Sequence, residues 1–163
     1  MAMDLKKSYT FFQPEKVTDP VHIIGIGAIG STLAVMLARI GMEKLYVYDF
    51  DTVSTHNIAN QQYRYEDVGA RKVDALTSIL KEINPKISVN KTADSWTPKK
   101  QLSGHVFMCV DNMKSRNEIM RHCSLNPQVV SVYDFRMGLT DAQHYAANTA
   151  SINSMNKMLK SMQ

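Results

Sequence analysis

The chain has 163 residues, of which 44% are hydrophobic and 21% are charged, and these values fit one globular domain with a core. No apolar run approaches the roughly 20 residues that span a bilayer, and the first seven residues lack the apolar segment of a signal peptide, so we expect a cytoplasmic protein with no membrane partner. The net charge of +4 comes from scattered lysines, which argues against a nucleic-acid partner.

The first 20 residues read as an N-terminal extension of a single domain that covers residues 1–163. Leu5, Tyr9 and Phe12 have the spacing of one apolar helix face, which predicts a short helix over residues 4–12. Pro14 and Pro20 then interrupt regular structure.

A glycine motif organises the next part of the chain. Residues 21–24 form a short, β-branched apolar run, as in a strand that is buried on both faces. Gly25, Gly27 and Gly30 follow as G-x-G-x-x-G and lead into a helix whose apolar residues have helical spacing: Ile29, Leu33, Met36, Leu37 and Ile40. In such motifs the glycines permit a tight turn, close approach to phosphate and close helix packing, with the helix N-terminus facing the anion. The motif therefore predicts a nucleotide-binding turn, the alternative being a structural glycine turn.

Carboxylates follow two of the predicted strands. Residues 44–48 form the second strand and lead to Asp49 and Asp51, and the apolar run 105–110 leads to Asp111. Doubly wound sheets bind ligands at the carboxyl ends of their strands, so we expect Asp49 to contact a ligand. For Asp51 a ligand role and a turn or cap role both remain open.

A polar segment over residues 52–67 is too long for a simple connection, and such loops often carry function. The helix that begins near Gly69 and stops before Pro85 has Arg71 and Lys72 in its first turn, where cations oppose the helix dipole. Either an anion offsets these charges or both side chains are exposed and tolerated.

The remaining elements complete an α/β pattern. We predict strands at residues 87–90, 105–110 and 128–133, a possible strand at 145–149, a helix at 114–125 and a C-terminal amphipathic helix at 150–163. Cys109 and Cys123 read as buried packing residues, and two cysteines cannot form a four-cysteine zinc site. The expected fold is a Rossmann-like, doubly wound, mostly parallel sheet with helices on both faces.

Several sequence blocks occur in order: the glycine loop, Asp49 to Val53, His56 to Gln61, Asp67 to Lys72, and the pair Asp111-Asn112. Over residues 21–138 this series resembles the adenylating domain of ubiquitin-activating-type enzymes, whose members include the activators of the molybdopterin and thiamine sulfur carriers. Dehydrogenases share the glycine loop but not the later blocks.

The resemblance implies that ATP and Mg²⁺ convert the C-terminal carboxylate of a ubiquitin-like or sulfur-carrier protein into an acyl-adenylate. It also implies a homodimer. Asp49 matches the ribose ligand, Asp51 the acid near the reacting phosphate, and Asp111 the magnesium aspartate. The other positions that match nucleotide-binding residues of the family are Gly25, Gly27, Ala28, Gly30, Asn57, Asn60, Lys72 and Asn112.

The chain departs from the family pattern in three places. Asn60 stands where relatives carry an arginine, and an amide cannot replace the charge and fork of a guanidinium. No arginine precedes Arg39, although family dimers lend one from the N-terminal segment, and little sequence follows Gly138. The alternatives are therefore an adenylyltransferase, a nucleotide-binding partner module without efficient catalysis, and an NAD-dependent oxidoreductase.

Overall fold

The computed structural model describes residues 3–162 and contains one six-stranded sheet. The spatial order of the strands is β3-β2-β1-β4-β5-β6, and all neighbouring pairs are parallel except β5 with β6. The chain order reverses between β1 and β4, which is where doubly wound sheets bind ligands. The bounds are β1 Val21–Ile24, β2 Lys44–Tyr48, β3 Ser88–Thr92, β4 Gly104–Met108, β5 Val129–Met137 and β6 Ala142–Asn148.

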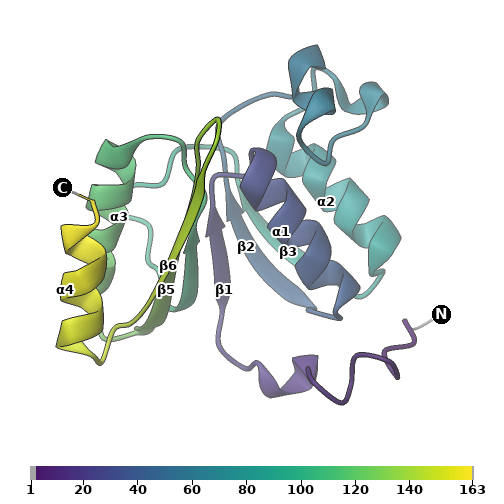
Figure 1. The fold of residues 1–163 in the computed structure, drawn as a ribbon. Coiled ribbons are helices and arrows are strands. Elements are labelled where there is room, and N and C mark those ends of the chain that lie inside the picture. The colour runs from purple at the N-terminus through teal and green to yellow at the C-terminus, as the bar shows by residue number, and fades with distance from the viewer. Residues whose placement is uncertain (1–2, 163) are drawn as a thin grey trace.

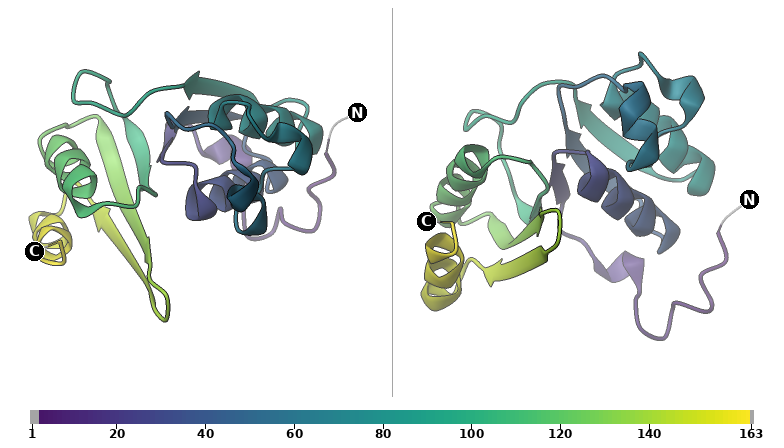
Figure 2. Two further views of the ribbon diagram at one scale, coloured as in Figure 1. Left: turned by 90° about the horizontal axis from the view of Figure 1, so that it is seen from above. Right: turned by 45° about the horizontal axis from the view of Figure 1, so that its top comes forward.

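Helices lie on both faces of this sheet (Figure 1). One face carries α1 (Ala28–Arg39) and α2 (Lys72–Ile83), and the other carries α3 (Met113–Ser124) and α4 (Ile152–Lys160). Seen from above, the two helix pairs cover different halves of the sheet (Figure 2). Short 3-10 turns occur at Pro14–Lys16, Thr55–Ala59 and Tyr65–Asp67. The predicted fold class is confirmed.

Helix α1 packs on the sheet through small residues. Gly30, Ala34 and Ala38 are fully or almost fully buried, because they allow the helix axis to approach the strands closely. The large apolar residues that predicted the helix lie on a neighbouring side, where Leu33 is half-buried and Met36 is 61% exposed. The periodicity therefore predicted the helix, but its buried face is a different one.

His22 is a buried polar residue inside the apolar strand β1. Its Nδ1 lies 2.9 Å from the Tyr48 hydroxyl, and its ring stacks on Tyr46 with centroids 4.6 Å apart. Burial lowers the pKa of His22 to about 4, so the imidazole is neutral near pH 7.

Two sequence predictions were wrong in detail. Residues 4–12 form successive turns rather than a helix: the amides of Ser8 and Tyr9 both donate to the Leu5 carbonyl, and Pro14 then begins a separate 3-10 turn. Strand β5 does not end before Asp134 but continues to Met137, because it pairs with β6 through residue 137.

The C-terminal helix covers the sheet. Met155, Met158 and Met162 are each at most 6% exposed and join the core between α3, α4 and strands β4 to β6. The methionine face of α4 is therefore occupied by contacts within the chain. Within residues 3–162 no helix combines the length and apolar character that crossing a membrane requires.

Candidate functional site

A cavity of about 720 Å³ opens at the carboxyl edge of the sheet, beside the point where the chain order reverses. It brings together segments that are distant in sequence: the glycine loop, the end of β2, the Thr55–Ala59 turn, the N-termini of α2 and α3, residues 95–96 after β3 and residues 136–137 at the end of β5. Among the predicted site residues, the cavity is lined by Gly25, Gly27, Ala28, Asp49, Asp51, Asn57, Asn60, Lys72, Asp111 and Asn112. Gly30 lies just behind this lining.

The three glycines have different physical roles. Gly25 has a φ of +86°, and a Cβ there would lie 2.9 Å from the backbone of Cys109. A Cβ on Gly30 would lie 2.0 Å from the Gly25 carbonyl oxygen, so only glycine permits this contact between helix and loop. A Cβ on Gly27 would meet nothing within 4 Å, and Gly27 caps α1 without a side-chain hydrogen bond. The first amides of α1 are thus available to an anion beside an open cavity.

Asp49 fastens the glycine loop. Its Oδ2 accepts a hydrogen bond from the Ile26 amide at 2.9 Å, and its Oδ1 accepts one from the Asp51 amide at 2.9 Å. Each carboxylate oxygen keeps a second lone pair that can accept a hydroxyl donor. Asp49 therefore has a structural duty in addition to the ligand role that the sequence predicted.

Tyr63 supports the same loop from the other side and was missed by the sequence reasoning. Its hydroxyl donates to the Ile26 carbonyl at 2.7 Å, and the side chain is buried. Burial, reinforced by the nearby carboxylates Asp49 and Asp51, raises the pKa of Tyr63, so the hydroxyl stays a donor.

Lys72 and Asp51 form a pair at the edge of the cavity. The Lys72 Nζ lies 2.8 Å from Asp51 Oδ2, and the Lys72 backbone amide donates to the Asp51 carbonyl at 2.9 Å. The lysine side chain is only 6% exposed, whereas that of Asp51 is 46% exposed. Asp51 is thus the anion that offsets a cation in the first turn of α2, while Arg71 is exposed as expected for a tolerated charge.

Asn57 is held by its own turn. Its Oδ1 accepts the Ser54 amide at 2.9 Å, and the residue is 5% exposed. The amide nitrogen is then the donor that remains for a ligand. Asn60 lines the cavity from an exposed position next to Gln61.

Asp111 and Asn112 connect β4 to α3. Asn112 caps α3, because its Oδ1 accepts the Ser115 amide at 2.8 Å, and its Nδ2 donates to Asp111 Oδ1 at 3.2 Å. Residues 3–162 contain no group of three or more acidic, histidine or cysteine side chains arranged for a metal. Magnesium in phosphate sites commonly takes one or two carboxylates together with substrate phosphates, so an exposed Asp111 in this cavity fits such an ion.

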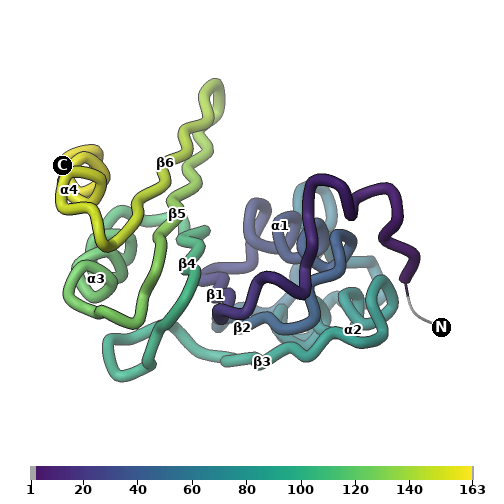
Figure 3. The backbone as a smooth tube through the Cα atoms, turned by 90° about the horizontal axis from the view of Figure 1, so that it is seen from below, coloured from purple at the N-terminus to yellow at the C-terminus, as the bar shows by residue number. Residues whose placement is uncertain are grey.

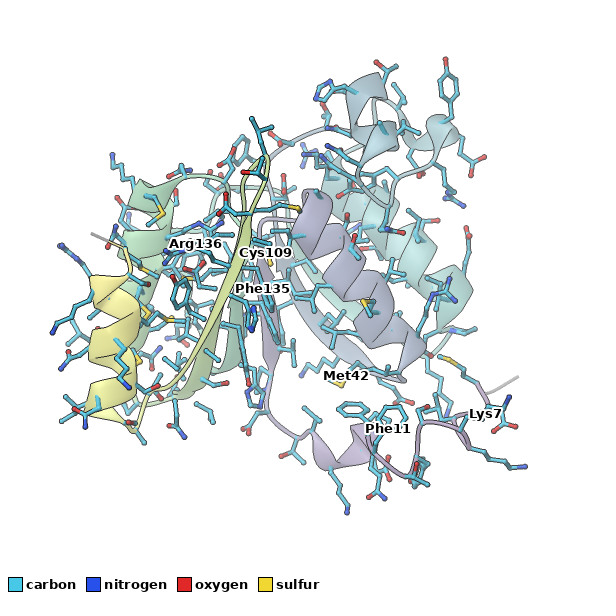
Figure 4. The ribbon with its side chains drawn as sticks, in the orientation of Figure 1. Lys7, Phe11, Met42, Cys109, Phe135 and Arg136 are labelled. Atoms are coloured by element: carbon cyan, nitrogen blue, oxygen red, sulfur yellow. The ribbon has the colours of Figure 1, made fainter. Side chains whose placement is uncertain are left out.

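A buried ionic network supports the second half of the cavity and was also missed. Asp134 is fully buried between the guanidinium groups of Arg116 and Arg136, and the Arg136 Nε donates to Asp134 Oδ2 at 2.7 Å. Arg116 also donates to the carbonyls of Met108 and Val110, the residues that precede Asp111. The network therefore fixes the turn that carries Asp111. Its member Arg136 is labelled in Figure 4.

The same network reaches the C-terminal helix. Arg136 Nη1 donates to the Ser161 carbonyl at 2.7 Å and Nη2 to the Ser161 hydroxyl at 3.0 Å, at the end of α4. The Tyr145 ring lies 4.6 Å from the Arg136 guanidinium carbon. All guanidinium nitrogens of Arg136 are thus engaged, Nε by Asp134 and both Nη atoms by Ser161, and its aliphatic part remains to line the cavity.

The cysteines have no sign of nucleophilic activation. Burial raises the pKa of both Cys109 and Cys123 to about 12, so each remains a neutral thiol. The expectation that they are packing residues agrees with their positions in the two cores.

A doubly wound sheet with a glycine loop, strand-end carboxylates and a buried lysine at one cavity is the arrangement typical of nucleotide-binding α/β proteins. The ThiF family model matches residues 16–133, and the chain belongs to the ThiF family.

Its relatives include activating enzymes. The chain is 33% identical over 125 residues to ubiquitin-like modifier-activating enzyme 5 of Arabidopsis thaliana, covering 64% of this chain and 29% of that protein. It is 32% identical over 124 residues to molybdopterin-synthase adenylyltransferase of Salmonella typhimurium, covering 72% of this chain and 50% of that protein. The chain thus spans half or less of either relative.

Solved structures share the fold. E. coli tRNA N6-threonylcarbamoyladenosine dehydratase, TcdA, superposes with a TM-score of 0.70 at 21% identity, over 80% of this chain and 58% of that one. E. coli MccB, crystallised with AMPCPP and MccA, gives a TM-score of 0.69 at 23% identity, over 76% of this chain and 38% of that one.

Proposed function

We propose that this protein binds ATP with Mg²⁺ and adenylates the C-terminal carboxylate of a ubiquitin-like or sulfur-carrier protein. The observation that carries the proposal is the gathering of the glycine loop, Asp49, the Asp51–Lys72 pair and Asp111 around one cavity. Two curated relatives bear the names of a modifier-activating enzyme and an adenylyltransferase, and a solved relative, TcdA, was crystallised in complex with ATP.

Each part of the cavity has a role toward the nucleotide. The free amides at the start of α1 and the side chains of Lys72 and Asn57 bind phosphate oxygens, because N–H donors and a cation match their charge. Asp49 accepts the ribose hydroxyls through its remaining lone pairs. Lys72 turns from Asp51 toward the outer phosphates when ATP arrives.

Asp111 is the residue that holds magnesium, with Asn112 fixing the orientation of its carboxylate. The ion contributes neutralisation of phosphate charge. Arg116 keeps the Asp111 turn in place through the Val110 carbonyl.

In the reaction, an oxygen of the carrier's carboxylate forms a bond to the α-phosphorus of ATP. The bond from that phosphorus to the oxygen that bridges to the β-phosphate breaks, and pyrophosphate leaves with the electron pair. Both reactants are anions, so the barrier falls when fixed donors and cations face the phosphates. Asp51 transfers no proton in this step. Its role is to hold Lys72 until ATP binds.

The second candidate is a nucleotide-binding partner module with slow chemistry. Two observations favour it: Asn60 occupies the cavity wall where relatives carry arginine, and Lys72 is already paired with Asp51. An NAD-dependent oxidoreductase remains the least favoured candidate, since it explains neither Lys72 nor Asn57. We further propose that the protein is a cytoplasmic homodimer.

ATP–pyrophosphate exchange tests the proposal, with glycine-terminated carrier proteins offered as the carboxylate. We expect slow exchange, and we expect Asn60→Arg to raise it by up to about 10²–10³, the usual worth of a preorganised transition-state donor, while ATP affinity changes little. The matched control is Gln62→Arg, which adds the same charge nearby on a side chain bonded to Thr32 of α1. No exchange by either form with any carrier, despite ATP binding, would favour the module.

A further inference from the structure

The C-terminal turn of α4, residues 158–162, lies away from the nucleotide cavity but is joined to it by ionic contacts. In Figure 3, α4 lies at the opposite end of the molecule from α1 and α2, and none of its described residues lines the cavity. A nine-residue helix is marginal by itself, so α4 depends on the contacts that hold it to the rest of the chain. Met158 and Met162 are buried, and Arg136 binds the Ser161 carbonyl just after the helix ends.

Arg136 caps this turn with its guanidinium group. Its Nη1 donates to the Ser161 carbonyl at 2.7 Å, and its Nη2 donates to the Ser161 hydroxyl at 3.0 Å. Carbonyls at the end of a helix have no partner within the helix, and a cation there also interacts favourably with the helix dipole. A guanidinium group can supply these donors and still bind a carboxylate, because its five N–H groups lie in a rigid fork.

The same guanidinium group satisfies Asp134. Asp134 Oδ2 lies 2.7 Å from Arg136 Nε and 2.6 Å from Arg136 Nη2, whereas Asp134 Oδ1 accepts from Arg116. Asp134 is fully buried, so a carboxylate oxygen that loses its donors there is left unsatisfied at a high cost. Displacement of Arg136 therefore changes how Asp134 holds Arg116, because burial keeps solvent from replacing the lost donors.

Arg116 carries this effect to the cavity. Its side chain donates to the carbonyl of Val110, the residue directly before Asp111. Arg116 also belongs to the first turn of α3, where its amide donates to the Asn112 carbonyl and the Ser115 amide donates to the Asn112 side chain. The amides of Ser115 and Arg116 therefore report on the order of the Asp111–Asn112 turn without any ligand.

We propose that Arg136 and Ser161 are positioning residues for the metal site. They act on Asp111 through the buried pair formed by Asp134 and Arg116. Docking of the α4 C-terminal turn and binding of Mg–ATP then favour each other, because both require the same arrangement of the network and such coupling is reciprocal. The link to Mg–ATP rests on the proposed function, in which Asp111 holds the ion. The link from α4 to the Asp111–Asn112 turn rests on the contacts within the chain.

Hydrogen exchange without nucleotide tests the coupling independently of ATP binding. Ser161→Ala removes one hydrogen bond to Arg136 at the end of α4. We expect the amides of Ser115 and Arg116 to exchange about 2- to 30-fold faster, the range for substitutions along a coupled network. The matched control is Ser154→Ala, at a half-buried serine about two turns earlier in α4, which should leave both exchange rates unchanged.

Arg136→Lys is the stronger variant, because an ammonium group keeps the charge but cannot span Asp134 and both oxygens of Ser161. Calorimetry measures ATP affinity with and without Mg²⁺, and far-UV circular dichroism and melting check the fold. We expect the gain in ATP affinity from Mg²⁺ to be at least about 2-fold smaller in Arg136→Lys than in the wild type, with affinity in the absence of Mg²⁺ unchanged. A purely structural role would weaken ATP binding equally with and without the ion.

The reverse effect is measured in the wild type. Mg–ATP should slow the exchange of the Ser161 and Met162 amides, which bond within the α4 C-terminal turn. ATP binding without any of these effects overturns the inference and leaves the proposed function. Absence of ATP binding, with faster exchange at Ser115 in Ser161→Ala, overturns the proposed function and leaves the coupling. Unchanged exchange at Ser115 in both Ser161→Ala and Arg136→Lys overturns the coupling whatever the nucleotide result.

Discussion

The two halves of the sheet build their side of the cavity in different ways. In the half formed by β1, β2, β3, α1 and α2, an apolar cluster, close packing at small residues and hydrogen bonds that join Asp49 and Tyr63 to the loop backbone shape the glycine loop. In the half formed by β4, β5, β6, α3 and α4, a network of two buried charges, Arg116 and Asp134, and the partly buried Arg136 fixes the turn that carries Asp111.

This difference determines how each half responds to substitution. Close packing fails gradually, because neighbours yield by fractions of an ångström. A buried ionic network fails sharply when one member is removed, because the others are left as unpaired charges. The second half is therefore expected to be the more fragile one.

The largest expected effect comes from removing the central charge of the network. Asp134→Ala leaves Arg116 and Arg136 without their shared anion, and we expect a loss of about 3–5 kcal/mol of unfolding free energy. Urea denaturation measures it. Asp94→Ala, which removes an exposed partner of Lys100, should cost at most about 1 kcal/mol. Equal losses of unfolding free energy in Asp134→Ala and Asp94→Ala would contradict the claim that the buried ionic network makes the second half more fragile.

The sequence predicted the elements and site residues of the first half far better than those of the second. The glycine spacing and the change of period from strand to helix placed β1, the loop and α1, and the strand-end rule placed Asp49, Asp51 and Asp111 at one edge. Arg116 and Asp134 gave no signal, because pairing between a helix and a distant strand has no period in the sequence. The strand itself was predicted to end before Asp134, since a charged residue normally marks a strand's end.

The seam between the halves is sensitive to pH through His22. Burial lowers its pKa to about 4 in the folded chain, whereas the unfolded chain has the usual value near 6.5. Below about pH 6.5 the unfolded state binds the extra proton, so the free energy of unfolding should fall by up to about 1.4 kcal/mol per pH unit down to pH 4. Comparing denaturation of the wild type and His22→Phe over this window checks it. If the free energy of unfolding depends on pH equally in both proteins, groups other than His22 cause the loss of stability.

The Lys72–Asp51 pair in the first half predicts that a substitution of Lys72 weakens the binding of ATP but not that of AMP. Lys72→Ala removes a charged donor to the outer phosphates, which is worth about 1.5–3 kcal/mol, or roughly 10- to 150-fold in ATP affinity. AMP lacks those phosphates, so its affinity should barely change. Calorimetry with both nucleotides measures the contrast, and Lys91→Ala, at an exposed lysine paired with Asp74, is the control. Equal weakening of ATP and AMP would place Lys72 elsewhere on the nucleotide.

The smallest expected effects on stability come from two glycines of the same loop, Gly30 and Gly27, and they differ from each other. Gly30→Ala forces a methyl group against the Gly25 carbonyl and should cost about 1–3 kcal/mol of stability. Gly27→Ala places its methyl group in open space, so stability should change by no more than about 0.5 kcal/mol, while nucleotide affinity falls. Thermal melts with and without ATP distinguish the two effects. A stable Gly30→Ala variant would mean that α1 shifts freely on the sheet.

The most direct test of the central claim is calorimetric titration of one preparation with ATP and Mg²⁺ and then with NAD. The cavity spans both halves, with Lys72 on one side and Asp111 on the other, and both groups favour a triphosphate with its metal. We predict that ATP binds more tightly than NAD and that omitting Mg²⁺ weakens ATP binding. Tighter binding of NAD, or no binding of either nucleotide, would contradict the account.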